Sequence, residues 1–147
     1  MENIKLNQSE ILTFNELISN LGLIDIYISR LNYSKVEIKP TTNKFEVKIN
    51  IKPGEIETEE KILKANINFN IKLNYDGAPF FKFEVDYKVV FSMKDIGTVE
   101  YDISVEKIKK FFLQKHIPRI VWPYLRQEFN NSTGKSGMKP FNLPIIM

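Results

Sequence analysis

Few residues in this chain of 147 could carry chemistry. His116 is the single histidine and there is no cysteine, which excludes thiolate nucleophiles, disulfides and transition-metal sites of the ordinary type. Two acidic pairs remain, Glu59 with Glu60 and Glu84 with Asp86. Lysines are interleaved around the second pair, so we interpret it as a solvated strand face rather than a two-carboxylate catalytic pair. We therefore predict no catalytic, cofactor-binding or metal-binding residues, and a protein that is not an enzyme.

One short segment, Gly134-Lys135-Ser136, is similar to the end of a phosphate-binding loop. That loop requires another glycine five positions before Gly134, where this chain has Phe129. It also requires a strand before it and a helix after it, and the sequence predicts neither. Nucleotide binding is therefore not expected, and a binding protein is favoured over an enzyme.

The composition favours a single soluble domain with an apolar binding face. Phenylalanine supplies eleven of the eighteen aromatic residues, and such side chains dominate cores and interfaces. The net charge of +3 is uneven, because residues 1–104 sum to −3 and residues 105–147 sum to +6. We interpret the basic final third as a solvated cationic face, with nucleic acid or an acidic partner as the alternative.

The sequence contains no segment that suggests targeting to a membrane. No apolar run approaches the roughly 18–20 residues that cross a bilayer. The first five residues also lack the basic start and apolar stretch of a signal peptide. A cytoplasmic location is expected.

The elements that must position any binding face begin with a helix within residues 1–23. Asn7 and Glu10 have the spacing of a capping box, and Gly22 marks the expected end. Four strands follow within residues 24–94, with apolar and polar residues alternating as in an antiparallel sheet that is solvated on one face.

Details of these strands are also predicted. Shifts in the alternation of the first strand, between residues 24 and 38, predict bulges or a twist. The second strand is expected to end at Pro53-Gly54, and Asp76-Gly77 is expected to form the turn before the last strand. Phe80 and Phe81 begin that strand, and one of the two should point away from the face that the other covers.

A kinked helix is expected over residues 103–131, capped by Asp102 or Ser104. Pro118 and Pro123 should kink or break it, and the polar run 130–137 should end it. Residues 138–147 are mostly apolar with two prolines, and we predict an extended strap that docks on the body of the protein.

The most specific signal is the segment Ile117-Pro118-Arg119-Ile120-Val121-Trp122-Pro123-Tyr124-Leu125-Arg126. It resembles the helix motif of the SecB family of export chaperones, in which an aromatic-Pro-Tyr-x-Arg sequence follows a proline and a few apolar residues. The segment Gly137-Met138-Lys139-Pro140-Phe141-Asn142-Leu143-Pro144-Ile145 is similar to the strap of the same family. The resemblance covers about residues 25–146.

The resemblance implies an α+β fold of one domain over residues 1–147. A four-stranded antiparallel sheet is packed by a long C-terminal helix, and the N-terminal helix is an addition to the family pattern. Members bind non-native polypeptides in apolar grooves without ATP. Many pass them to the motor SecA, and a second branch protects antitoxins of toxin–antitoxin systems. Dimers form by joining sheet edges, and tetramers by packing long helices together.

From these observations we select two groups of residues. Candidates for contact with a client or another subunit are Phe80, Phe81, Phe91, Phe111, Phe112, Trp122 and Tyr124. Residues of the family motifs with a structural role are Pro118, Pro123, Arg126, Gly137, Pro140, Leu143 and Pro144.

Three functional hypotheses follow. The first is an ATP-independent SecB-like chaperone that holds unfolded polypeptides, either for export or for one dedicated client. The second is an oligomeric interaction protein with one fixed partner, such as an antitoxin, and the third is a weak nucleic-acid binder. Ile108, Phe111, Phe112, Ile120, Val121 and Leu125 offer more apolar surface than one sheet needs to cover. The last strand has a regular pattern without an internal proline, so we also expect it to leave an edge able to pair with a second copy. We therefore expect a homo-oligomer, a dimer at least, with a tetramer as the arrangement that the resemblance implies.

Overall fold

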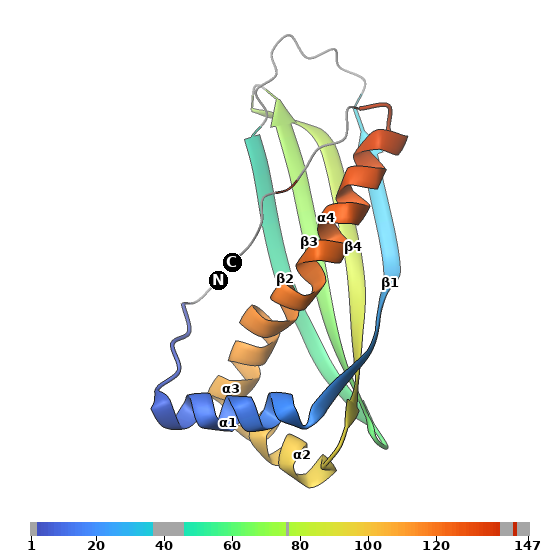
Figure 1. The fold of residues 1–147 in the computed structure, drawn as a ribbon. Coiled ribbons are helices and arrows are strands. Elements are labelled where there is room, and N and C mark those ends of the chain that lie inside the picture. Colours follow the sequence, from blue (N-terminus) through green and yellow to red (C-terminus); the bar gives the residue numbers. More distant parts are fainter. Residues whose placement is uncertain (1–2, 37–45, 76, 139–142, 144–147) are drawn as a thin grey trace.

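The computed structural model describes residues 3–36, 46–75, 77–138 and 143. Helix α1 (Gln8–Ser19) precedes four strands, β1 (Leu21–Lys35), β2 (Glu46–Glu59), β3 (Ile62–Tyr75) and β4 (Ala78–Met93). The chain continues through α2 (Ile96–Ser104), α3 (Glu106–Phe111), the π-helical turn η1 (Phe112–His116) and α4 (Ile117–Lys135). The four strands form one antiparallel sheet, and α4 crosses one of its faces, as Figure 1 shows. The predicted α+β fold is confirmed.

The order of the strands across the sheet is β1-β4-β3-β2. β1 and β2 follow one another in sequence but form opposite edges of the sheet. Strands that are consecutive in sequence therefore pair only within β2, β3 and β4. The expectation that the last strand offers a free edge is wrong, because β4 pairs with β1 on one side and β3 on the other. From Phe81 onward its regular alternation reflects this central position, where the residues of the helix-facing side are all buried.

Bulges shape both edge strands. β1 has register shifts between Leu23 and Asp25 and between Ile28 and Arg30, which confirms its expected irregularity. β2 does not end at Pro53-Gly54 but continues past a shift between Pro53 and Ile56. An edge strand tolerates proline because one of its sides needs no N–H donor. A Cβ at Gly54 would lie 2.8 Å from the Cβ of Asn66, so the close approach of β2 and β3 requires glycine there.

The start of β4 differs from expectation. Leu73 pairs with Phe81, whereas Asn74 pairs with Pro79, so an extra residue of β4 lies at Phe80. Both Phe80 and Phe81 are buried, so neither presents an exposed ring, and the bulge breaks the strict alternation on which the prediction of opposite faces depended. Gly77, between the paired ends of β3 and β4, has a φ of +78°. Asp76 lies outside the described residues.

The N-terminal helix has the predicted cap. The Asn7 side chain accepts a hydrogen bond from the Glu10 backbone N–H at 2.9 Å, and the Glu10 carboxylate accepts one from the Asn7 N–H at 2.9 Å. The helix ends at Ser19, however, and Gly22 belongs to β1, beside Ser92.

The helical region after the sheet begins earlier than expected. α2 is capped by Asp95, whose side chain accepts from the Thr98 N–H at 3.1 Å. Asp102 and Ser104 lie within α2, so neither caps the following helix, which starts at Glu106. The irregularity falls in the π-helical turn η1 before Pro118, and Pro118 stands at the start of α4, where its missing N–H costs no hydrogen bond.

α4 is also longer than predicted. It continues through Pro123 and through most of the polar run expected to end it, because Ser132 and Thr133 are buried on its inner side. Their hydroxyl groups bond within the helix, and Thr133 donates to the Asn130 carbonyl at 2.9 Å. Of the predicted strap, only Met138 and Leu143 lie within the described residues.

Candidate functional site

Aromatic side chains fix α4 and η1 to the sheet. The Phe129 ring centroid lies 5.1 Å from that of Phe83 and 5.8 Å from that of Phe81. Trp122 lies 6.2 Å from Phe69, and Phe112 lies 5.8 Å from Phe91. These contacts cover the centre of the helix-facing side of the sheet, called the inner face below.

Most of the predicted contact residues serve this core. Phe80, Phe81, Phe91, Phe112 and Trp122 are buried within the chain. Their burial leaves them without surface that a polypeptide could contact in this conformation.

The other two candidates lie nearer the surface. Phe111 is half-buried, and its ring packs edge-on against Phe14 of α1 at 4.8 Å. Tyr124 is the one candidate that is exposed, on α4. It remains a proposed contact.

The motif residues have structural surroundings. Arg126 donates from its Nε to the carbonyl oxygen of Leu143 at 2.8 Å, and the Leu143 side chain is buried in the core. Gly137 has a φ of +79°, just after the end of α4. Pro118 is buried and Pro123 is exposed, whereas Pro140 and Pro144 lie outside the described residues. Arg126 therefore ties Leu143 to α4.

The sequence did not single out the apolar residues that flank α4. The inner face of each edge strand extends beyond the helix, as Figure 1 shows for β1 and β2. We name four inner-face residues the flank residues, because each is more than a third exposed: Leu23 (51%), Ile28 (37%) and Leu31 (36%) on β1, and Ile49 (37%) on β2. Their opposite neighbours on β3 and β4 are buried. The shifted alternation of β1 was the only signal for the three flank residues on that strand.

The two edges of the sheet differ in character. β2 carries Pro53 and several glutamates and lysines along its length, which are features that oppose pairing with another strand. β1 extends over fifteen residues without proline, with Asp25 and Arg30 as its charged residues before Lys35. β1 is therefore the edge more open to an additional strand.

The titratable groups do not form a catalytic arrangement. Burial lowers the pKa of His116, with a further contribution from the charge of Arg119, so its imidazole stays neutral between the Phe14 and Phe112 rings. Burial raises the pKa of Tyr87, with a further contribution from Glu128. None of the described acidic or histidine side chains forms a group of three that could hold a metal ion.

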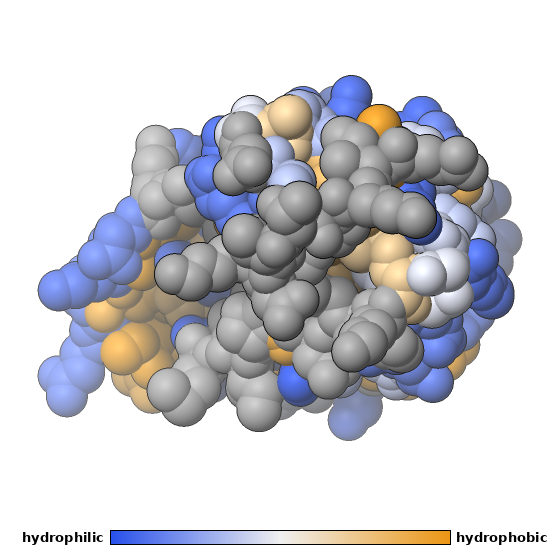
Figure 2. Space-filling model, turned by 90° about the horizontal axis from the view of Figure 1, so that it is seen from above, coloured by the Kyte–Doolittle hydropathy of each residue, from blue (hydrophilic) through white to orange (hydrophobic). Residues whose placement is uncertain are grey.

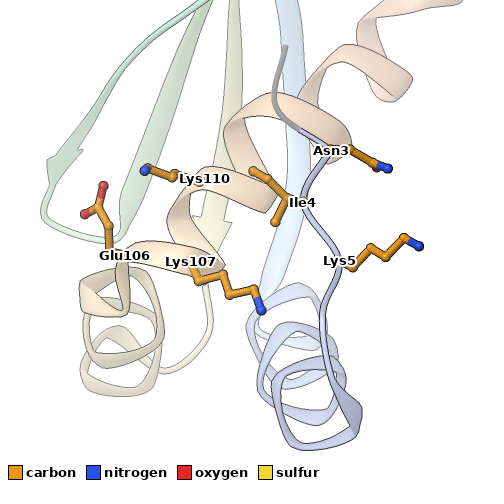
Figure 3. A pocket seen from close by; sticks show the side chains of 6 residues that line it. All are labelled: Asn3, Ile4, Lys5, Glu106, Lys107 and Lys110. Carbon is orange, nitrogen blue, oxygen red and sulfur yellow. The ribbon is translucent and has the colours of Figure 1, made fainter.

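A shallow pocket of about 520 Å³ lies between the N-terminal arm and α3 (Figure 3). Its polar groups do not converge, because Figure 3 shows Asn3 and Lys5 pointing to one side and Glu106 and Lys110 to the other. Lys107 already forms an ion pair with Glu10 at 2.9 Å. The pocket therefore lacks the arrangement that a small polar substrate would need.

Apolar surface also occurs around α1. Figure 2, a view from above, shows apolar surface next to hydrophilic surface on the side where α1 lies. Ile11 and Leu12 of α1 are exposed, Leu12 by 70%. In the part of the chain that the structure describes, no helix is long and apolar enough to cross a membrane.

Comparison with known proteins gives a consistent result. The Protein-export protein SecB of Orientia tsutsugamushi, strain Boryong, is 28% identical over 112 residues, which cover 76% of this chain and 62% of that protein. The same protein of strain Ikeda is also 28% identical, over 76% of this chain and 61% of that protein. The chain thus spans about three fifths of the length of the curated relatives it matches.

The fold also matches a solved structure. A SecB-like chaperone of Mycobacterium tuberculosis, in complex with a peptide from an antitoxin, superimposes with a TM-score of 0.78 at 11% identity. The match covers 92% of this chain and 97% of that one. The profile of the family described as "Preprotein translocase subunit SecB" matches residues 18–146, and this chain therefore belongs to the SecB family.

Proposed function

We propose that the protein is an ATP-independent chaperone that holds non-native polypeptide against the flank residues on either side of α4. The observation that carries this proposal is the exposure of apolar inner-face residues on both edge strands. Membership of the SecB family supports it. The proposed activity requires no catalysis and no cofactor, and we propose that it takes place in the cytoplasm.

The flank residues suit an extended apolar segment. Burial of a side chain such as Leu or Ile is worth about 1.5–3 kcal/mol when it is complete, and these residues are already partly covered. Each flank residue therefore contributes less than that range, and several contacts must act together. Weak, repeated contacts of this kind suit clients that share apolar character rather than one sequence.

The test is suppression of aggregation of a chemically unfolded client without nucleotide, followed by light scattering. The wild-type chain should suppress aggregation, and Leu31→Gln or Ile49→Gln should weaken suppression because each substitution places an amide on a flank. Leu12→Gln is the matched control, since Leu12 is the more exposed side chain and lies on α1. Unchanged aggregation at severalfold excess of wild-type chain would refute the chaperone proposal. Equal effects of all three substitutions would refute the assignment to the flanks.

A dedicated client is the second candidate. The Mycobacterium tuberculosis chaperone that shares this fold was solved with an antitoxin peptide, which favours one fixed partner such as an antitoxin. The Orientia relatives are named for protein export, which favours precursor polypeptides and transfer to the motor SecA. Affinities for a panel of unrelated unfolded polypeptides separate the two. Similar affinities favour a general export chaperone, and one affinity at least tenfold above the rest favours a dedicated partner.

A further inference from the structure

The face of the sheet opposite α4, called the outer face here, carries a row of lysines that run across three strands. Lys48 of β2 is paired in register with Lys72 of β3, and Lys72 is paired with Lys82 of β4. Their neighbours along each strand point to the inner face, so all three side chains share the outer face. We name Lys48, Lys72 and Lys82 the lysine row.

This arrangement costs stability. Residues directly opposite one another on adjacent strands have Cβ atoms about 4.5–5.5 Å apart, and like charges at such positions are destabilising. Lys72 and Lys82 are exposed and make no ion pair among the described residues. Lys48 is 4.0 Å from Glu46, with both side chains 63% exposed, and such a pair contributes little.

The acidic residues nearest along β4 do not neutralise the row. Glu84 and Asp86 share the outer face with Lys82, but both are bound by Arg30, which donates from Nε to the Asp86 carboxylate at 3.0 Å and from a terminal nitrogen to Glu84. Asn68 donates to both carboxylates as well, at 2.6 Å to Asp86 and 3.2 Å to Glu84. Among the described residues, no ion pair joins these two carboxylates to the lysine row, although together they carry one more negative charge than Arg30 neutralises. The three lysine side chains are exposed and therefore available to a partner.

The residues next to the row extend its capacity to bind carboxylates. Asn50 and Asn70 are paired in register one step along β2 and β3, and Ser34 of β1 is paired with Lys82. These positions add amide and hydroxyl donors to the ammonium groups. None of them is aromatic, so this part of the face lacks the stacking platform on which single-stranded nucleic acids depend.

We propose that the lysine row binds an acidic segment of a partner polypeptide. Adjacent strands lie about 4.7–4.9 Å apart, and carboxylates three or four residues apart on a helix lie about 5–6 Å apart. A helix with acidic residues along one face therefore matches the spacing of the row. This site lies on the face opposite the flank residues and does not depend on the proposed chaperone function.

The test measures binding of a fluorescein-labelled helical peptide with glutamates along one face, by fluorescence anisotropy at low salt. Lys72→Gln with Lys82→Gln should weaken binding by about twofold to thirtyfold, because each exposed ion pair is worth about 0.2–1 kcal/mol. The same variant should have a higher Tm than wild type, since it removes a pair of opposed like charges. Weaker binding by a more stable protein cannot be explained by unfolding.

The control removes the same charge elsewhere. Lys5→Gln with Lys110→Gln replaces two exposed lysines on the helix side and should leave the affinity within about twofold. The proposal is overturned if this control loses as much affinity, or if a peptide with glutamine at every glutamate binds equally well. It is also overturned if a thymidine oligonucleotide of equal charge binds more tightly and is weakened more by Lys72→Gln with Lys82→Gln. A lower particle mass for that variant would instead identify a second copy of this chain as the occupant.

Discussion

Asp102 holds a buried carboxyl group where α2 packs against α1. Its side chain is 1% exposed, and Oδ2 has no hydrogen-bond partner among the described residues. Burial, together with a hydrogen bond to the Glu16 carboxyl group and the charge of that group, raises the pKa of Asp102 to about 6. The folded chain therefore binds this proton more tightly than the unfolded chain. The resulting stabilisation is present below about pH 4 and is lost as the pH rises through about 6.

We therefore expect Asp102→Asn to stabilise the protein at pH 8, by about 1–3 kcal/mol, because it removes a buried charge. The gain should shrink as the pH falls toward about 4, where wild-type Asp102 is protonated. Urea denaturation of both proteins at several pH values measures this difference. A gain that is the same at pH 8 and pH 4 would contradict the explanation.

His116 gives the opposite pH dependence. Because burial and Arg119 lower its pKa in the folded chain, its contribution is present above about pH 6.5 and is lost as the pH falls below that value. His116→Phe should keep the ring contacts with Phe14 and Phe112 but remove the titration. The difference in stability between the variant and wild type should therefore favour the variant more at pH 5 than at pH 7.5. Chemical denaturation at both values tests this, and equal differences would count against a buried neutral imidazole.

At the residue scale, the sequence identified large aromatic residues but not their surroundings. Phe112 and Trp122 were selected as candidates for contact with a client or another subunit, and both are buried contacts between the helices and the sheet. The flank residues were missed because exposure depends on the path of α4, which no local pattern encodes. Leu23 and Ile28 are ordinary strand residues in the sequence, and only their position beyond the helix leaves them exposed.

At the scale of elements, α1 is attached to the core chiefly through Leu17. Leu17 is the fully buried residue of this helix, and Phe14 adds the contact with Phe111. Nearly all of α1 precedes residues 18–146, the part that matches the SecB family.

Leu17→Ala should destabilise the protein by about 2–5 kcal/mol, because it leaves a cavity between α1 and the core. Leu12→Ala on the same helix should change stability by less than about 0.5 kcal/mol, since Leu12 is exposed. Thermal denaturation of both variants provides the comparison. Similar losses would mean that α1 does not pack through Leu17.

Helix and strand types were predictable, but several boundaries were not. The capping box of α1 is a local signal, and it holds. By contrast, a proline ends a strand only where the sheet needs a backbone N–H donor at that position. Pro53 lies on β2, an edge strand with one side that needs no such donor. The polar run after Asn130 stays helical because tertiary contacts bury Ser132 and Thr133. These outcomes depend on neighbours distant in sequence.

At the scale of the whole molecule, the case for self-association changes. Six apolar residues of the C-terminal helical region were expected to require a second copy of the chain. Four of them, Ile108, Phe112, Val121 and Leu125, are buried within one chain, so they do not require a partner. Instead, β1, the edge without proline, carries five exposed apolar residues: Leu23, Ile24, Tyr27, Ile28 and Leu31.

We expect two copies to pair through β1, which would join their sheets and cover unpaired backbone groups along that edge. Light scattering at micromolar concentration should give at least twice the 17.2 kDa of one chain. Ile28→Lys should reduce the mass to one chain. Ile28 lies in the middle of β1, so a two-fold axis through this edge would place the two lysines near each other.

Ile49→Lys is the matched control, because Ile49 has the same 37% exposure on the inner face of the other edge strand. β2 is already protected by proline and charges, so this variant should keep the wild-type mass. Loss of association by both variants would mean that the inner face, and not the β1 edge, joins the copies. A wild-type particle of 17.2 kDa would refute the expectation altogether, whereas a mass of four chains would show that two such pairs associate further.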